Sequence, residues 1–520
     1  MKKLILIFTA ILFYSFSGIS QPVTPEQIDR LTEKVMKTFD VPGIAVAVVK
    51  DGKVVYAKGH GARSLKSGGK VDENTLFGIA SNSKAFTTAT LAILVDEKKL
   101  SWDDKVTRYI PEFRLYNSYV TEDFTIRDLI THRSGLGLGA GDLMIWPDSS
   151  DFKINDIIYN LRFLKQTSPF RTKFDYDNLL FMVAGEVVTR VSGTKWEQFV
   201  DDKIMNPLGM NRTAASFARL KDKTNVIDGH AFADNKLKAI VRHDLPDGEC
   251  AAGGIYSSIS DMSKWMIAQL NGGKYGADLE KQLFSASAQR EMWRPQTIMP
   301  VRTDKYNSHF SAYGLGWFVT DVKGTKQVSH TGGMEGMVTQ VTLLPELKLG
   351  IVVLTNQETG AAFSAITNTI KDSYLGFEPE DWVLHYDTLV SKNREKTGEL
   401  TKKIQEEMDK TLNSVNLEID PDRFAGKYLD DWLGTVQIVK SGEKLWFKSL
   451  RSPQLRGEMS FYKGNTFVVK WVNRSMNADA FIDFDLDTEG KADGFSMKPV
   501  SPLTDFSYDF QDLNFKRVEN

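Results

Sequence analysis

Apolar and polar positions follow two different periods along the chain, and the changes between them outline its organisation. Near the N-terminus, residues 43–49 and 53–58 are apolar and rich in β-branched side chains. Asp51 and Gly52 lie between them, a pair typical of a tight hairpin. Residues 85–95 then form an apolar run interrupted only by threonines. Such a run predicts a helix that is buried on every side of a large domain.

Helical patterns fill the middle of the chain, and strand patterns return after Gly314. The helical patterns cover residues 125–131, 179–191, 196–205 and 260–270, and a further one covers 361–374. The later strands are predicted at residues 316–321, 327–330, 338–344 and 350–354. We therefore expect an α+β fold, in which an antiparallel sheet built from both ends of residues 21–379 is flanked by helices and interrupted by an all-helical subdomain.

The C-terminal third has a different character. Residues 380–419 are highly charged, with Leu400, Ile404, Met408, Leu412 and Val415 at helical spacing, which predicts a connector containing one helix that lies on a neighbouring surface. Residues 420–520 hold five short strand signals with regular turns, at 435–439, 444–447, 466–472, 480–486 and 495–498. This spacing predicts a small all-β barrel or sandwich domain.

The first twenty residues are typical of a secretory signal peptide. Lys2 and Lys3 precede an apolar core over residues 4–16, and small residues follow at 18–20. The core is short for a membrane span, and no cysteine follows it for lipid attachment. We expect a periplasmic or secreted protein with no stable membrane anchor. Cys250 is the only cysteine, which excludes an internal disulfide. The net charge of -2 gives no electrostatic case for nucleic acid as a partner.

A serine and a lysine stand at the start of the apolar run 85–95. Ser81 and Lys84 are three residues apart, so on a helix they share a face. Desolvation favours the neutral amine of a buried lysine, which can then take a proton from a neighbouring hydroxyl. The same S-x-x-K spacing recurs at residues 67, 150, 192, 441 and 460, but only Ser81 opens a long buried helix. We expect Ser81 to be an acylating nucleophile and Lys84 to activate it.

Two further motifs supply groups that such a serine needs. Tyr176 and Asn178 form the only Y-x-N in the chain, in a polar loop before an apolar helix. His330, Thr331, Gly332 and Gly333 end a predicted strand, where glycines let a substrate approach the backbone. The amide of Gly333 could pair with that of Ser81 as an oxyanion hole. The literal K-T-G at 396–398 lies in the charged connector, outside any predicted strand.

These three motifs, in this order, resemble those of serine β-lactamases and penicillin-recognising carboxypeptidases, specifically the class C-like branch with its esterases and D-amino-acid peptidases. The stretches 125–135 and 253–258 look alike too, and the similarity runs from about residue 24 to 375. The resemblance implies that Lys84 and Tyr176 handle the proton and that Asn178 orients the substrate. His330 would then be the strand-edge group, and Gly333 an oxyanion donor. Residues 424–428 begin a part that resembles the lipocalin-like domain of some relatives.

The resemblance implies an exported serine hydrolase that acts on an ester, an amide or a D-amino-acid peptide. Many β-lactamases carry lysine where His330 stands, and neutral histidine gives no permanent charge for a substrate carboxylate. β-Lactamase or D-Ala-D-Ala carboxypeptidase activity stays an alternative, as does a sensor or scaffold that binds penicillin or peptidoglycan without turnover. The seven histidines are scattered, so neither a metal nor a cofactor is expected. A homo-oligomer is compatible with the sequence.

Overall fold

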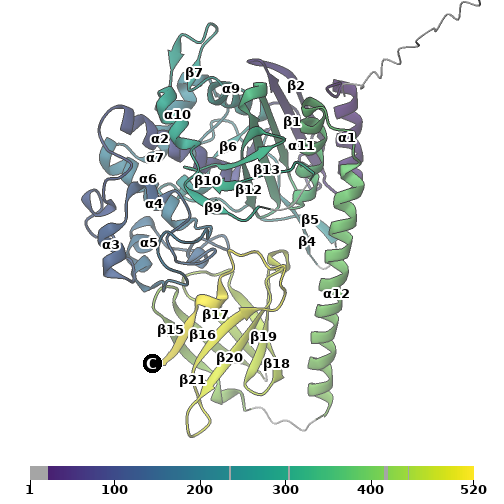
Figure 1. Ribbon diagram of the computed structural model, residues 1–520. Coiled ribbons are helices and arrows are strands. Elements are labelled where there is room, and N and C mark those ends of the chain that lie inside the picture. Colours follow the sequence, from purple (N-terminus) through teal and green to yellow (C-terminus); the bar gives the residue numbers. More distant parts are fainter. Residues whose placement is uncertain (1–20, 234–235, 302–304, 415–419, 443, 520) are drawn as a thin grey trace, which may run out of the picture.

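The structure is a computed structural model that describes residues 21–233, 236–301, 305–414, 420–442 and 444–519. The predicted signal peptide at residues 1–20 lies outside the described residues. In Figure 1 the α+β part of the chain lies above a C-terminal barrel, and one long helix runs down the side of both. The predicted α+β fold with a C-terminal β-barrel is confirmed.

An eight-stranded sheet forms the centre of the α+β part, and every neighbouring pair in it is antiparallel. The strand order is β2-β1-β14-β13-β12-β11-β10-β9, so the sheet contains strands from both ends of the domain, as predicted, and β1 pairs directly with β14 near one edge. The strands are β1 (Gly43–Lys50), β2 (Lys53–Gly61), β9 (Thr297–Met299), β10 (Ser311–Tyr313), β11 (Phe318–Val322), β12 (Thr325–Met334), β13 (Met337–Leu344) and β14 (Leu349–Thr355).

Alternation along β1 explains how the sheet is covered on both faces. Ile44, Val46 and Val48 belong to one buried cluster, which they share with helices α1 (Pro25–Thr38) and α11 (Gly360–Leu375). Ala45, Ala47 and Val49 point to the other face and join the larger core under α2 (Ser83–Asp96) and α9 (Ile259–Leu270). A strand that is buried on both faces has no polar alternation, which is why this segment reads as a continuous apolar run.

The helices predicted in the middle region are present, with two differences, and further short helices that were not predicted lie between them. The helix predicted at 125–131 is only four residues long, α4 (Ile126–Leu129). The helix predicted at 196–205 changes from α7 (Trp196–Val200) to a π-helical turn at Asp201–Met205. The remaining helices and the small strand pairs are α3 (Ser118–Asp123), α4 (Ile126–Leu129), α5 (Ile154–Asn160), α6 (Leu179–Ser192), α7 (Trp196–Val200), α8 (Asn206–Leu208) and α10 (Ala286–Met292), with β3 (Phe77–Gly78) and β6 (Tyr256–Ser257), β4 (His230–Ala233) and β5 (Lys236–Ala239), and β7 (Lys274–Tyr275) and β8 (Lys281–Gln282).

Helix α12 (Trp382–Ser414) connects the two parts of the molecule, and the K-T-G of residues 396–398 lies within it. Trp382 and Val383 are buried with α1 and α11, and Met408 is buried against Tyr462 and Val468 of the barrel. The barrel that follows closes completely, so that no strand edge is left open. Its strands are β15 (Gly426–Asp430), β16 (Gly434–Ser441), β17 (Lys444–Ser449), β18 (Arg456–Lys463), β19 (Thr466–Trp471), β20 (Ala480–Leu486), β21 (Ala492–Pro499) and β22 (Asn514–Val518). Among the described residues, no helix has the length and apolar content that crossing a bilayer requires.

Candidate active site

Ser81 lies in a single 3₁₀ turn, Ala80–Asn82, which leads directly into helix α2. The residue before it, Ala80, has a φ of +47°, in the left-handed region that non-glycine residues enter at a cost of about 1–3 kcal/mol. This sharp turn brings Ser81 to the start of the helix with its side chain in a cavity. The α-helical geometry itself begins at Ser83, two residues after Ser81.

The amine of Lys84 makes three hydrogen bonds in a fully buried position. Its Nζ lies 3.1 Å from Ser81 Oγ and 2.7 Å from Asn178 Oδ1, and it donates to the carbonyl of Ala252 at 2.9 Å. Burial lowers the pKa of Lys84 from 10.5 to about 7, although Asp142 and Asp177 act in the opposite direction. The neutral amine that a general base requires is therefore well populated at neutral pH.

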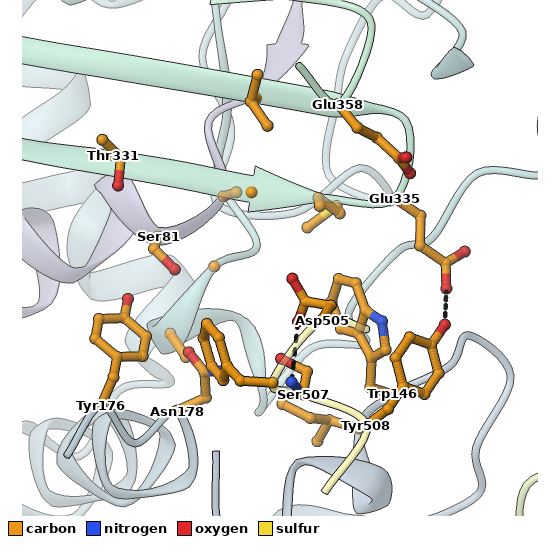
Figure 2. Close-up of a pocket in the computed structure, with 18 of the residues that line it drawn as sticks. Ser81, Trp146, Tyr176, Asn178, Thr331, Glu335, Glu358, Asp505, Ser507 and Tyr508 are labelled. Atoms are coloured by element: carbon orange, nitrogen blue, oxygen red, sulfur yellow. Dashed lines mark hydrogen bonds between the residues drawn. The ribbon is translucent and has the colours of Figure 1, made fainter. Parts of the chain in front are cut away.

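Tyr176 faces the same hydroxyl from the opposite wall. Figure 2 shows its phenol pointing toward Ser81, and Lys84 Nζ lies 4.7 Å from the centre of its ring. Burial raises the pKa of Tyr176, although the nearby Ser81 acts in the opposite direction, so the phenol keeps its proton at neutral pH. The ring of His132 packs beneath it with centroids 4.1 Å apart. This arrangement would allow Tyr176 to donate a proton and Lys84 to accept one.

Two buried carboxyl groups, for which no role was predicted, act on Lys84, and Asn178 connects it to one of them, Asp142. Its Nδ2 donates to Asp142 Oδ2 at 2.7 Å, and burial raises the pKa of Asp142 well above its usual value. Asp177 Oδ1 accepts from the backbone N–H of Leu180 at the start of α6, and burial raises the pKa of Asp177 to about 7. Asp177 stands inside the Y-x-N motif, whereas nothing in the sequence around Asp142 separates it from an ordinary loop residue.

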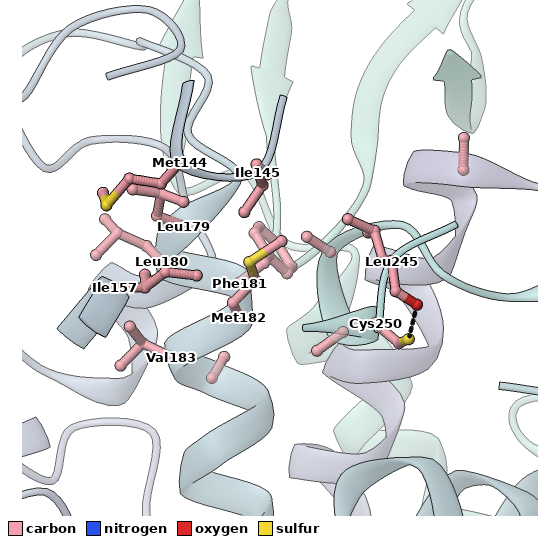
Figure 3. Close-up of a cluster of buried hydrophobic side chains, with 14 of the residues drawn as sticks. Met144, Ile145, Ile157, Leu179, Leu180, Phe181, Met182, Val183, Leu245 and Cys250 are labelled. Carbon is pink, nitrogen blue, oxygen red and sulfur yellow. Dashed lines mark hydrogen bonds between the residues drawn. The ribbon is translucent and has the colours of Figure 1, made fainter. Parts of the chain in front are cut away.

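The foundation of this wall is a packed apolar cluster. In Figure 3 the side chains of Leu179, Phe181 and Met182 on α6 lie near those of Met144 and Ile145, which follow Asp142 in the chain. All five are buried or nearly so and belong to the main core. Because close-packed side chains resist displacement, both ends of the hydrogen bond between Asn178 and Asp142 are held by rigid packing.

Strand β12 divides the His-Thr-Gly-Gly motif between its two faces. Thr331 and Gly333 line the cavity, whereas the side chain of His330 is buried and its Nε2 lies 3.0 Å from the hydroxyl of Tyr313. Burial lowers the pKa of His330 to about 3 and keeps it neutral. The side chain of His330 therefore lies behind Tyr176, with ring centroids 6.3 Å apart, rather than in the lining of the cavity. Its role as the strand-edge group stays a prediction.

Gly332 allows β12 to approach the turn that carries Ser81. A Cβ at this position would stand 2.2 Å from the carbonyl oxygen of Ile79, so no other residue fits without moving one of the two segments. Gly333, the next residue, lines the cavity beside Ser81, and no atom lies within 4 Å of its potential Cβ. The backbone amides of Ser81 and Gly333 are thereby the candidate donors to a developing oxyanion.

The cavity around Ser81 has a volume of about 650 Å³ and a distinct charge character. Three carboxyl groups line it, those of Glu335, Glu358 and Asp505, and no lysine, arginine or histidine does among the described residues. Burial, together with mutual repulsion and Asp148, raises the pKa of Glu335 to about 7. The basic side chain that contacts Ser81 is Lys84, which lies behind it and does not line the cavity.

One group of potential metal ligands occurs among the described residues, away from this cavity. Side-chain atoms of Glu197, Asp247 and Cys250 lie within 4.8 Å of one another. Burial raises the pKa of Cys250 well above its usual value, and its thiol donates to the carbonyls of Leu245 and Pro246. A protonated thiol with two acceptors is a poor metal ligand, so the group does not favour a metal centre.

The chain is similar to several known proteins. The unguisins hydrolase ungD of Aspergillus violaceofuscus is 28% identical over 389 residues, 70% of this chain and 68% of that protein. Protein flp of Staphylococcus aureus is 25% identical over 333 residues, and this chain spans 63% of its length. Among solved structures, an octameric penicillin-binding protein homologue from Pyrococcus abyssi has 22% identity and a TM-score of 0.60, over 94% of this chain and 99% of that one.

A mutant class C β-lactamase is similar over 67% of this chain and 95% of its own, with 21% identity and a TM-score of 0.54. At these identities the two solved structures show the fold alone. A domain of unknown function (DUF3471) matches residues 420–517, the barrel. The profile of the Beta-lactamase family matches residues 28–375, which include all three motifs and most of the chain. The chain therefore belongs to the Beta-lactamase family, whose relatives include proteins named as hydrolases.

Proposed function

We propose that the protein is an exported serine hydrolase that cleaves an ester, amide or D-amino-acid peptide bond through an acyl-enzyme on Ser81. The observation that carries this proposal is the hydrogen bond between Ser81 Oγ and Lys84 Nζ. Lys84 is buried, and its pKa is lowered to about 7. Its partner Ser81, by contrast, lines the cavity. A lysine with only a structural role would not need a hydroxyl group of the cavity as its partner.

The reaction follows from the positions of the groups. Neutral Lys84 takes the hydroxyl proton of Ser81 while Oγ attacks the scissile carbonyl, and the negative oxygen is stabilised by the amides of Ser81 and Gly333. Tyr176 donates its proton to the leaving group and is reprotonated from Lys84, which leaves the acyl group on Ser81. Water then attacks this ester and releases the acid. Asn178 holds the Lys84 amine and faces the cavity, where its amide can orient the substrate.

The charges in the cavity favour neutral or cationic substrates. β-Lactams and D-Ala-D-Ala peptides carry a carboxylate, which requires a cation nearby, and the described cavity lining holds three carboxyl groups and no basic side chain. This supports ester, amide or aminopeptidase chemistry over β-lactamase or D-Ala-D-Ala carboxypeptidase activity. We therefore expect faster turnover of uncharged esters than of a chromogenic cephalosporin.

The test is acylation and turnover of an activated ester by the wild type and by Ser81→Ala. We expect a fluorophosphonate probe to label Ser81, with labelling lost in Ser81→Ala, and steady release of p-nitrophenol from p-nitrophenyl acetate. Labelling that persists in Ser81→Ala would identify a different nucleophile. A single burst without further release would favour the sensor or scaffold.

Export and assembly complete the proposal. The signal peptide in the sequence supports a periplasmic or secreted location, which cleavage of the leader in a secreting host would test. A homo-oligomer is supported only by the name of the Pyrococcus abyssi homologue, which is octameric. Sedimentation of the mature chain would decide this second point.

A further inference from the structure

The barrel reaches into the catalytic cavity. Leu503, Asp505, Phe506, Ser507 and Tyr508, in the loop between β21 and β22, all line it. In Figure 2 this segment lies across the cavity from Ser81 and Tyr176. Ser475, Met476 and Asn477, from a second barrel loop, line the same cavity. The space beside the nucleophile is thus enclosed by two domains of the chain, although the family match for the catalytic part ends at residue 375.

Buried contacts fix this loop against the catalytic domain. The carboxyl group of Asp509 is fully buried and accepts hydrogen bonds from the backbone N–H groups of Gly141 at 2.6 Å and Leu143 at 3.1 Å. Ser507 Oγ donates to Asp142 Oδ2 at 3.0 Å. Because buried bonds to a carboxyl group are strong and costly to leave unmade, they hold the loop in one position.

Phe506 is the side chain of this loop that meets the catalytic groups. Its ring stands edge-on to that of Tyr176, with centroids 5.7 Å apart. Its carbonyl oxygen lies 2.5 Å from where a Cβ of Gly139 would stand, and Gly139 has a φ of +72°, so this glycine admits the loop backbone. Phe506 as a whole is 38% exposed, and it lines the cavity.

We propose that residues 503–508 of the barrel are the substrate-selecting wall of the active site and that Phe506 is a specificity-determining residue. This inference rests on the proposed serine hydrolase function. A substrate whose scissile carbonyl meets Ser81 must direct one of its two substituents past Tyr176 and Asn178 toward this wall. The position of Phe506 then limits the size of that substituent.

The test compares Phe506→Ala and Phe506→Trp with Leu429→Ala in the full chain. Leu429 is an apolar barrel residue of similar exposure, 42%, and it lines no part of the cavity. The probes are p-nitrophenyl acetate, butyrate and octanoate, which vary the acyl group, and 4-methylumbelliferyl acetate, which enlarges the leaving group. Values of kcat/KM are measured for each. Stoichiometric labelling of Ser81 by a fluorophosphonate confirms that each variant is folded and competent.

In at least one series, we expect Phe506→Ala to raise the ratio of kcat/KM for the larger probe to kcat/KM for the smaller probe by about tenfold. Phe506→Trp should lower the same ratio. The Leu429→Ala ratios should equal those of the wild type. Unchanged ratios in both Phe506 variants, or a uniform loss for all probes, would overturn the inference while normal Ser81 labelling leaves the hydrolase function standing. Absence of labelling in the wild type would instead overturn the hydrolase function itself.

Discussion

The pH dependence of Ser81 acylation tests the central electrostatic feature of the site. An ordinary lysine with a pKa of 10.5 would be neutral in only about one molecule in three thousand at pH 7. Burial brings the pKa of Lys84 to about 7, so about half of the molecules hold the neutral base. Desolvation therefore increases the population of the active form by roughly a thousandfold.

The acylation rate should follow that population. We expect it to rise roughly fiftyfold between pH 5 and pH 7 and to level off above pH 8, with a midpoint near 7. The assay is the pre-steady-state release of p-nitrophenol from p-nitrophenyl acetate, measured in stopped flow. His330 does not account for such a midpoint, because burial lowers its pKa to about 3. Tyr176 does not either, because burial raises its pKa.

Three carboxyl groups require controls, because the pKa values of Asp177, Glu335 and Glu358 are each raised to about 7. Glu335→Gln and Glu358→Gln should leave the midpoint unchanged. Asp177→Asn should lower it, because the Asp177 carboxylate raises the pKa of Lys84. Lys84→Met should reduce acylation by about 10²–10⁴-fold and flatten the profile. A midpoint near 7 that persists in Lys84→Met would refute the assignment of Lys84 as the base.

Three further outcomes follow from single contacts. Gly332→Ala should reduce acylation of Ser81 and lower stability by about 1–3 kcal/mol in urea unfolding, because the added methyl group meets the carbonyl of Ile79. Glu335 has a folded-state pKa near 7 and an ordinary value of 4.5, so its ionisation costs stability as the pH rises between these values. Glu335→Gln should therefore stabilise the protein by about 1–3 kcal/mol at pH 8 and hardly at all at pH 4. Ser507→Ala removes the hydrogen bond to Asp142 and should lower kcat several-fold. Ser507→Thr keeps a hydroxyl group at this position and should restore kcat.

Much of the fold could be predicted because the signals are local. In the sequence, the burial of β1 on both faces is visible as an uninterrupted apolar run. The burial of α2 on all sides is visible as a helical segment without a polar face. The sequence also allows a prediction of which residues of the His-Thr-Gly-Gly motif face opposite sides of the strand. Residues 330 and 333 are an odd number apart, so on one strand their side-chain positions face opposite sides.

Contacts between distant segments gave no such signal. Asp142 follows a glycine-rich stretch, residues 135–141, which predicts a loop but no role for the carboxyl group. Asp142 becomes distinctive only when Asn178 and Ser507 hydrogen-bond to it from 36 and 365 residues away. Docking of the barrel depends on hydrogen bonds from the backbone N–H groups of Gly141 and Leu143 to Asp509. The hydrophobic pattern of the sequence does not indicate these bonds. Hydrophobic patterning predicts which elements form, whereas the specific docking of one domain on another is decided by a few buried polar contacts.

Barrel docking should also act on Lys84 through Asp142. Burial raises the pKa of Asp142, and the docked loop contributes to that burial; a hydrated Asp142 would ionise and raise the pKa of Lys84. Asp509→Ala leaves two buried N–H groups without an acceptor, at about 1–3 kcal/mol each, which weakens docking. We expect the acylation midpoint to rise above that of the wild type in Asp509→Ala, and not in Asp431→Ala, which removes an exposed barrel carboxylate. Adding Asp142→Asn to Asp509→Ala should cancel the rise; a rise that survives it would show that docking reaches Lys84 by another route.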